Sequence, residues 1–260
     1  MNDVMKNFLL FASISFLFGC SSNNSTADAG VQAASNPDKF TSLAAAPNAL
    51  TAEEEADGWE LLFDGTNTDQ WTGVGSDTFP ENGWIIENEA LVLAEGGNIM
   101  TRKEYADFDL RFEFNMTPAA NSGIKYYVSK LTNKESGKVV TNGPEYQIID
   151  DYTNPDVKDQ ADEREKAAAL YLLYAPTDKN LLPAGQWNTG RIVSKDQKVE
   201  HWLNGVQVLS YNRGSQDFRE RKKATKFKNY DAYGESERGH ILLTDHGDKV
   251  YFRNIKIKQL

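Results

Sequence analysis

Residues 108–116 read Phe-Asp-Leu-Arg-Phe-Glu-Phe-Asn-Met, so apolar and polar side chains alternate along this stretch. Successive side chains of a β-strand point to opposite faces of the sheet, which places every second residue on the same side. The apolar face carries Leu110, Phe112, Phe114 and Met116. The polar face carries Arg111, Glu113 and Asn115. The stretch therefore predicts a strand with one buried and one exposed face, as in a two-sheet β-sandwich.

Shorter runs of the same kind extend in both directions from this strand. From Trp59 onward, segments rich in β-branched and aromatic residues alternate with clusters of Gly, Asn, Asp and Pro, a pattern typical of an all-β sandwich. The pair Asn204-Gly205 predicts a type I′ hairpin turn, because that turn needs a positive φ at both central residues. Residues 158–169 and 217–227 are predicted as short helical segments. The predicted strands cover residues 59–63, 84–86, 90–93, 108–116, 123–128, 146–149, 170–174, 190–194, 198–203, 206–211, 240–244 and 250–258.

The composition sets limits on the class of protein. A chain of 260 residues with 40% apolar residues can bury one sizeable core, and no internal repeat suggests a second one. The net charge of −10 repels phosphate backbones, and no stripe of Lys and Arg is interleaved with stacking aromatics. Both observations argue against nucleic acid as a partner. The single cysteine excludes an internal disulfide framework and a Cys-based zinc cluster.

The N-terminus has the features of an export signal. Lys6 precedes the apolar residues 8–18, which are followed by Gly19 and Cys20. Because about 20 apolar residues are needed to cross a bilayer, this shorter run predicts a secretory signal peptide rather than a spanning helix. Residues 17–20, Leu-Phe-Gly-Cys, resemble the lipobox of bacterial lipoproteins, in which the cysteine is acylated. An ordinary secretory signal with an incidental cysteine is the alternative.

These features divide the chain into three predicted parts. Residues 1–19 are the signal peptide, and residues 20–50, rich in Ser, Asn and Ala, form a flexible tether. Residues 51–260 form the β-sandwich domain. We expect the protein in the cell envelope, attached to a membrane only through the lipid on Cys20.

A series of short motifs follows in a fixed order from about residue 58 to the C-terminus. The motifs are residues 58–65 with Trp71 following, then 84–91, 105–114, 121–124, 143–151, 183–188, 199–205, 225–228, 239–247 and 251–257. Together and in this order they resemble the 3-keto-disaccharide hydrolase family. The resemblance implies a concanavalin-like jelly roll of two antiparallel sheets, one of them curved into a concave sugar-binding face. The chain departs from the family pattern at Tyr127 and Thr244, where relatives commonly carry Arg and Gln.

The resemblance also implies a chemistry. A ketone at C3 of a sugar acidifies the hydrogen on C2, so a base can remove this proton and the glycosidic oxygen at C1 can leave. Water can then add to the resulting enone. This route needs a base, an acid for the leaving group, and a donor or cation for the enolate. The implied substrate is an oligosaccharide or glycoside, and a separate oxidoreductase is the implied partner that installs the ketone.

Glu145 is the candidate base. By alternation, Glu145 and Gln147 point away from Tyr146 and Ile148, so an inward apolar pair leaves the acid and the amide facing solvent or a cleft. We therefore predict Glu145 as a catalytic residue and Gln147 as a substrate-binding residue. The alternative is an ordinary solvated acid on an exposed sheet face.

Further substrate-binding candidates lie on neighbouring segments. The same alternation predicts that Lys125 and Tyr127 point outward, where they can bind sugar hydroxyls or stabilise an enolate. Their alternative is an amphipathic surface pair. Asn121, which opens one of the motifs, and His240 complete the predicted substrate-binding set.

The triplet Asp245-His246-Gly247 follows an apolar run at a predicted strand end. Histidine exchanges protons near neutral pH, so Asp245 and His246 are predicted as catalytic residues. A turn closed by Asp with a capping His is the alternative. His201 shares its strand face with apolar residues and is predicted to be a hydrogen-bonded, half-buried histidine.

No cofactor is predicted, because the three histidines show no recognised metal-binding spacing. A divalent cation held by carboxylate oxygens of Glu145, Asp150 or Asp245 is the one candidate. Two other classes of protein stay open beside the enzyme: a non-catalytic carbohydrate-binding lipoprotein and an adhesion sandwich. A carboxylate next to a cation in a polar site favours the enzyme.

Overall fold

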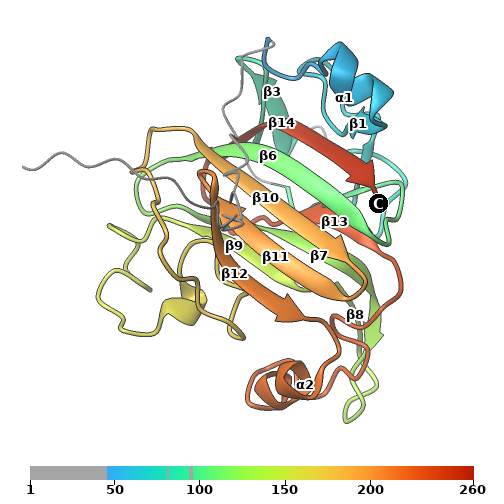
Figure 1. The fold of residues 1–260 in the computed structure, drawn as a ribbon, viewed down its shortest axis with the longest axis vertical. Coiled ribbons are helices and arrows are strands. Elements are labelled where there is room, and N and C mark those ends of the chain that lie inside the picture. Colours follow the sequence, from blue (N-terminus) through green and yellow to red (C-terminus); the bar gives the residue numbers. More distant parts are fainter. Residues whose placement is uncertain (1–45, 81, 94–95) are drawn as a thin grey trace, which may run out of the picture. The chain divides into compact units, whose positions relative to one another are not determined.

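In the computed structural model, residues 46–80, 82–93 and 96–260 are described, and their strands form two antiparallel sheets that pack face to face (Figure 1). The predicted signal peptide, Cys20 and most of the predicted tether lie outside the described residues. None of the helices in the described ranges has the length and apolar composition needed to span a membrane.

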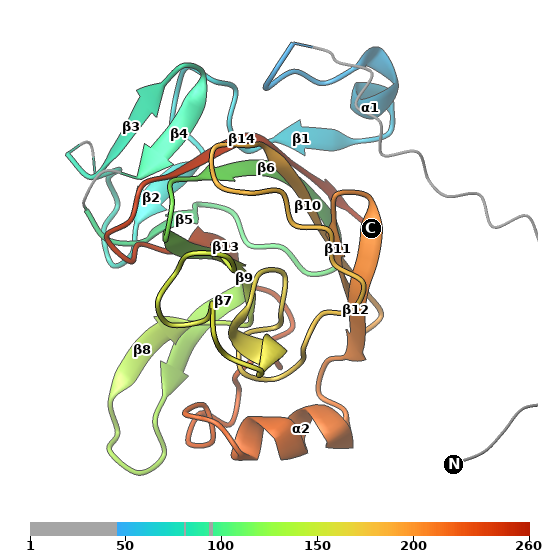
Figure 2. The same ribbon diagram turned by 90° about the vertical axis from the view of Figure 1, so that its left-hand side faces the viewer.

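The larger sheet has the strand order β12-β11-β10-β6-β14-β4-β3, and β1 pairs with β14. Its strands are β1 (Trp59–Leu61), β3 (Trp84–Glu87), β4 (Ala90–Leu93), β6 (Phe108–Met116), β10 (Asn188–Lys195), β11 (Lys198–Leu203), β12 (Val206–Asn212) and β14 (Val250–Gln259). Figure 2 shows this sheet curving around the smaller one.

The smaller sheet has the strand order β2-β5-β13-β7-β8, and β9 also pairs with β7. Its strands are β2 (Trp71–Gly73), β5 (Ile99–Thr101), β7 (Asn121–Thr132), β8 (Val139–Asn142), β9 (Glu145–Ile149) and β13 (His240–Leu243). The helices of the described ranges are α1 (Ala52–Ala56), α2 (Gln216–Lys223) and the 3-10 turn η1 (Glu163–Glu165). The predicted all-β sandwich with short helical segments is confirmed.

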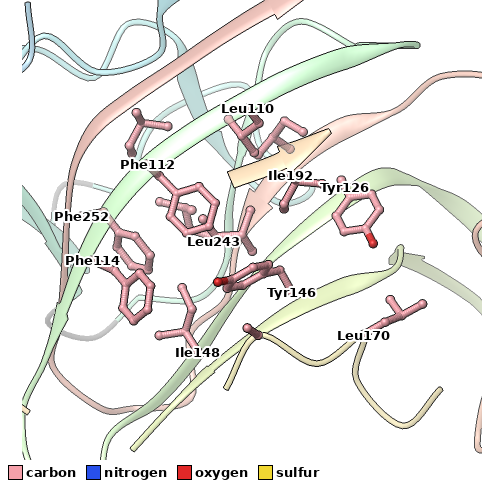
Figure 3. Close-up of a cluster of buried hydrophobic side chains, with 14 of the residues drawn as sticks. Leu110, Phe112, Phe114, Tyr126, Tyr146, Ile148, Leu170, Ile192, Leu243 and Phe252 are labelled. Atoms are coloured by element: carbon pink, nitrogen blue, oxygen red, sulfur yellow. The ribbon is translucent and has the colours of Figure 1, made fainter. Parts of the chain in front are cut away.

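Alternate residues of facing strands build the core between the sheets. Leu110 and Phe112 of β6 and Ile192 of β10 point toward Tyr146 and Leu243 of the smaller sheet (Figure 3), and each of these five is at most 2% exposed. The rings of Phe112 and Tyr146 meet edge-on, with centroids 5.3 Å apart and planes at 90°. The apolar face predicted for residues 108–116 is therefore the inner face of the larger sheet.

Two predicted elements are wrong. Residues 158–169 contain only the short η1, and residues 170–174 form isolated bridges instead of a strand. The backbone of Ala168 and Leu172 has φ values of 65° and 66°, which interrupt both helix and strand geometry. Contacts with β9 explain the outcome, because the amide of Gln147 donates to the carbonyl of Ala169 at 3.1 Å and the amide of Tyr171 donates to that of Glu145 at 3.0 Å. Tertiary pairing overrides local helix propensity here.

β7 contains a β-bulge. Lys125 pairs with Leu242 of β13 and Val128 pairs with His240, so two residues of β7 face one residue of β13. Tyr127, one of the two, has a φ of 50° and is 1% exposed. The outward orientation predicted for Tyr127 is wrong, because an extra residue shifts the alternation to the other face.

The predicted domain boundary at residue 51 falls inside a packed segment. Asn48 is 5% exposed. Its side-chain oxygen accepts from the amide of Asn254 at 2.8 Å, and its side-chain nitrogen donates to the carbonyl of Glu89 at 2.7 Å. The packed domain therefore begins no later than Asn48.

A buried hydrogen-bonded chain crosses the core at His201. Nδ1 of His201 lies 3.0 Å from the carbonyl oxygen of Ala168, which can only accept, so Nδ1 carries the proton. Nε2 therefore accepts from the hydroxyl of Tyr126 at 2.8 Å, and this hydroxyl accepts from Tyr211 at 2.8 Å. The predicted hydrogen-bonded histidine is confirmed, although it is fully rather than half buried.

We expect this histidine to make the domain acid-sensitive. Burial lowers the pKa of His201 to about 4, whereas in the unfolded chain it is about 6.5. The unfolded state thus binds the proton more tightly, so the stabilisation is complete above pH 6.5 and is lost as the pH falls toward 4. The full loss is about 3 kcal/mol. Urea unfolding of the parent and of His201→Gln between pH 7 and 4 checks this, since the variant should show a shallower decline. Parallel declines would contradict the prediction.

Candidate active site

A row of side chains crosses the outward face of the smaller sheet. Leu242 of β13 pairs with Lys125 of β7, and Lys125 pairs with Glu145 of β9. Residues paired across strands share a face, and the neighbouring pair of Ile124 and Tyr146 points into the core. Lys125 and Glu145 therefore point outward, as predicted.

The row places an ammonium group beside a carboxylate. Nζ of Lys125 lies 3.7 Å from Oε2 of Glu145. The two side chains are 17% and 7% exposed, so both charges are largely withdrawn from water. Poor screening strengthens such a pair relative to one on the surface. A carboxylate in this setting can take a proton from a ligand, and the ammonium can stabilise negative charge formed on the same ligand.

Gly123 provides the space in which the carboxylate lies. A Cβ atom at Gly123 would be 2.4 Å from Oε1 of Glu145, far inside van der Waals contact. Directly after the neighbouring strand β13, the hydroxyl of Thr244 lies 3.4 Å from Oε1 and 3.1 Å from the carbonyl oxygen of Gly123. The carboxylate therefore lies against the backbone of Gly123, which has no side chain, and next to the hydroxyl of Thr244.

Two side-chain amides, those of Gln147 and Asn121, share the outward face of the sheet with Glu145. Gln147 pairs with Gly123, and its Nε2 donates to the carbonyl of Glu165 at 3.2 Å. This bond orients the amide and turns Oε1 the other way. Within the described ranges, Oε1 of Gln147 and Oδ1 of Asn121 are buried without a hydrogen-bond partner. Both oxygens therefore keep unused capacity to accept a hydrogen bond.

Tyr171 lies next to Glu145 on its other side, and sequence reasoning missed it. The amide of Tyr171 donates to the carbonyl of Glu145 at 3.0 Å, and the adjacent pair of Leu170 and Tyr146 forms an antiparallel bridge. Leu170 points into the core (Figure 3), so Tyr171 shares the outward face with Glu145. The sequence did contain a sign of this orientation. Alternation along the predicted strand 170–174 puts Leu170 and Tyr171 on opposite faces.

Asp245 holds a loop in the described structure. Its carboxylate accepts from the amides of Gly96 at 3.2 Å, Gly97 at 2.6 Å and Gly247 at 2.7 Å. Burial alone would raise the pKa of Asp245, but these bonds and the nearby charge of His246 hold it below its ordinary value. These bonds fit the alternative to a catalytic role, in which Asp245 closes a turn. The His246 side chain is exposed.

The structure does not bring the other predicted substrate-binding residues to Glu145. His240 precedes Thr244 by four residues, which is about 13 Å along a strand, and its Nδ1 donates to the carbonyl of Thr101 at 2.7 Å. The hydroxyl of Tyr127 donates to the carbonyl of Ala106 at 2.7 Å, inside the sandwich. A buried tyrosine in this position cannot contact a sugar on the outward face, so the substrate-binding role predicted for Tyr127 is withdrawn.

The cation candidates are dispersed. Oδ2 of Asp150 accepts from the amide of Ala119 at 2.9 Å and from the hydroxyl of Thr153, and Oδ1 accepts from the amide of Tyr152 at 3.0 Å. In the described part of the chain, no three His, Cys, Asp or Glu residues are grouped closely enough to hold a metal ion.

A shallow hollow lies on the outer face of the larger sheet. It is lined by Thr189, Gly190, Arg191, Trp202 and Gly205. The guanidinium of Arg191 is 5.5 Å from the Trp202 ring and binds Asp109 through two hydrogen bonds. The hollow lacks a lining carboxylate, so the face around Glu145 is the better candidate for chemistry.

The chain is similar to several known proteins. The family described as 3-keto-alpha-glucoside-1,2-lyase-like domains matches residues 58–258. The chain is 29% identical over 243 residues to a 3-keto-disaccharide hydrolase of Bacteroides thetaiotaomicron, covering 84% of this chain and 83% of that one. A solved structure of a candidate glycosyl hydrolase from Parabacteroides distasonis has a TM-score of 0.73 and 34% identity, covering 83% of this chain and 100% of the other. A second structure from that organism, with a TM-score of 0.58, 24% identity and coverage of 78% and 99%, shares the fold.

Proposed function

The chain belongs to the family of 3-keto-alpha-glucoside-1,2-lyase-like domains, and from this premise we propose that it cleaves the glycosidic bond of 3-keto-disaccharides by elimination followed by hydration. Membership of the family makes it an enzyme that acts on sugars. The observation that carries the mechanism is the pair of Lys125 and Glu145, whose charged atoms lie 3.7 Å apart on the outward face of the smaller sheet.

Each group of the site has a role in the proposed reaction. Glu145 removes the proton from C2, next to the ketone, and the charge that develops on the C3 oxygen is stabilised by the ammonium of Lys125. We assign the binding of sugar hydroxyls to the side chains of Gln147 and Asn121, which share the outward face with Glu145. Binding energy from these hydroxyls positions C2 over the carboxylate. The ketone itself must come from a separate oxidoreductase that oxidises C3 of the glycoside.

The test compares two substrates that differ only in the oxidation state of C3. The parent protein is incubated with a disaccharide and with its 3-keto derivative, and released monosaccharide is measured. We expect release from the 3-keto derivative alone, since only the ketone acidifies C2. Cleavage of neither compound, together with saturable binding of the sugar, would replace the enzyme with the carbohydrate-binding alternative.

We also propose that acylation of Cys20 holds the protein at a membrane of the cell envelope, on the basis of the Leu-Phe-Gly-Cys sequence at residues 17–20. Two acyl chains anchor a protein stably, whereas the domain has no other proposed attachment. Cys20→Ala should therefore move most of the protein from the membrane fraction to the soluble fraction after export. Retention of the variant in the membrane fraction would refute the anchor.

A further inference from the structure

The elimination needs an acid as well as a base, and the groups described so far leave that role open. When the C1–O bond breaks, the departing sugar leaves as an alkoxide unless a proton reaches its oxygen. Glu145 is the proton acceptor of the same step, and Lys125 lies on the side of the carboxylate toward β13. The acid must therefore come from another group that reaches the opposite side of Glu145.

Tyr171 occupies that opposite side. Lys125, Glu145 and Tyr171 follow one another across β7, β9 and the segment paired with the outer edge of β9. Adjacent strands are about 4.8 Å apart, so the three side chains rise from evenly spaced points on one face. In the substrate, C3 and C1 are the two neighbours of C2. If Glu145 lies below C2, Lys125 on one side can face the ketone at C3. Tyr171 on the other side can then face the leaving oxygen at C1.

We infer that Tyr171 is the catalytic acid that protonates the leaving glycosidic oxygen, an inference that rests on the proposed elimination. In the first step Glu145 takes the C2 proton, the C–H electrons form the C1=C2 bond, the C1–O bond breaks, and the phenol proton passes to the leaving oxygen. In the second step water adds its oxygen to C1 and gives a proton to the phenolate, while Glu145 returns its proton to C2. Both side chains end in their starting states, and the net reaction is hydrolysis.

The surroundings of Tyr171 suit this role. Its side chain is half-buried. Burial and the negative charges of Glu165 and Glu145 raise its pKa, so the phenol holds its proton until a strongly basic oxygen appears. The ammonium of Lys226 lies 4.6 Å from the centre of the Tyr171 ring, where it offsets negative charge on the transient phenolate.

The test uses the dependence of the rate on the leaving group. Tyr171→Phe removes the proton and keeps the ring. On a 3-keto-disaccharide, whose leaving group is a poor alkoxide, we expect kcat to fall about 10²-fold with little change in KM. On the 4-nitrophenyl 3-keto-glucoside, whose leaving group needs no proton, kcat should change less than about threefold. Tyr251→Phe, on β14 of the larger sheet, is the matched control and should leave both rates at the parent values.

Each other result is informative. Equal losses on the two substrates, or no loss on either, would overturn the role of Tyr171 while leaving the proposed function intact. A parent protein that cleaves neither 3-keto compound would overturn the proposed function and this inference with it. A melting temperature of Tyr171→Phe close to that of the parent confirms that the rates compare folded proteins.

Discussion

Glu145→Gln should lower the turnover of 3-keto-disaccharide by about 10²–10⁴-fold, because the variant keeps the shape of the side chain and loses its basicity. The carboxylate is the group beside Lys125, with Nζ 3.7 Å from Oε2, and a neutral amide can neither take the C2 proton nor attract the ammonium. The fall should appear in kcat and in kcat/KM alike, as expected for an interaction that acts in the transition state. Steady-state kinetics with the 3-keto substrate measures it.

The matched control is Glu113→Gln. Glu113 is also a shielded acid with a cationic partner, since its side chain is 14% exposed and its Oε2 lies 2.7 Å from Nε of Arg253. It lies on β6 of the larger sheet, outside the proposed site. The control can lose some stability with the ion pair, but it should keep the parent kcat. Parent-like kinetics of Glu145→Gln would remove Glu145 from the mechanism and direct attention to Asp245 and His246.

Gly123→Val is expected to reduce turnover by a similar factor, about 10²–10⁴-fold, although no titratable residue is replaced. The first atom of a side chain at this position would lie 2.4 Å from Oε1 of Glu145 and 3.0 Å from its Cδ and Cγ atoms. The end of the Glu145 side chain can rotate away, so the fold should survive. The base, however, would no longer lie where the proposed mechanism requires it.

A double-mutant cycle separates this explanation from general damage. If valine acts only by displacing the carboxylate, then Gly123→Val combined with Glu145→Gln should be scarcely slower than Glu145→Gln alone. Additive losses would mean that Gly123 matters for another reason, such as access of the substrate to the sheet. Thermal unfolding of all three variants shows whether the comparison is between folded proteins.

Sequence reasoning succeeded where the side-chain period alone decides the outcome. The alternation along residues 108–116 gave the inner face of β6, and the same rule placed Lys125 and Glu145 outward. It failed at Tyr127, because a bulge adds one residue and the period carries no sign of it. It also missed β2, β5 and β8, which are only three or four residues long.

The rest of the site depends on which strands are neighbours and in what register. Gly123 and Thr244 adjoin Glu145 only because β13, β7 and β9 pair as they do. Tyr171 belongs to a segment that the sequence presents as a strand but that the structure uses as a bridge. Asp245 looked catalytic beside His246, although its oxygens serve backbone amides. Neighbours brought together by long-range pairing leave no local pattern.

The segment that pairs with the outer edge of β9 has a consequence for self-association. A free strand edge offers a row of N–H and C=O groups on which another polypeptide can assemble. Along β9, the backbone groups of Gln147 and Glu145 that point away from β7 are bonded to Ala168, Ala169 and Tyr171. Substitutions in this segment that alter substrate choice would therefore also risk exposing the edge of β9, on which other chains could aggregate. Evolution of a new substrate specificity at this site must therefore preserve resistance to aggregation as well as catalysis.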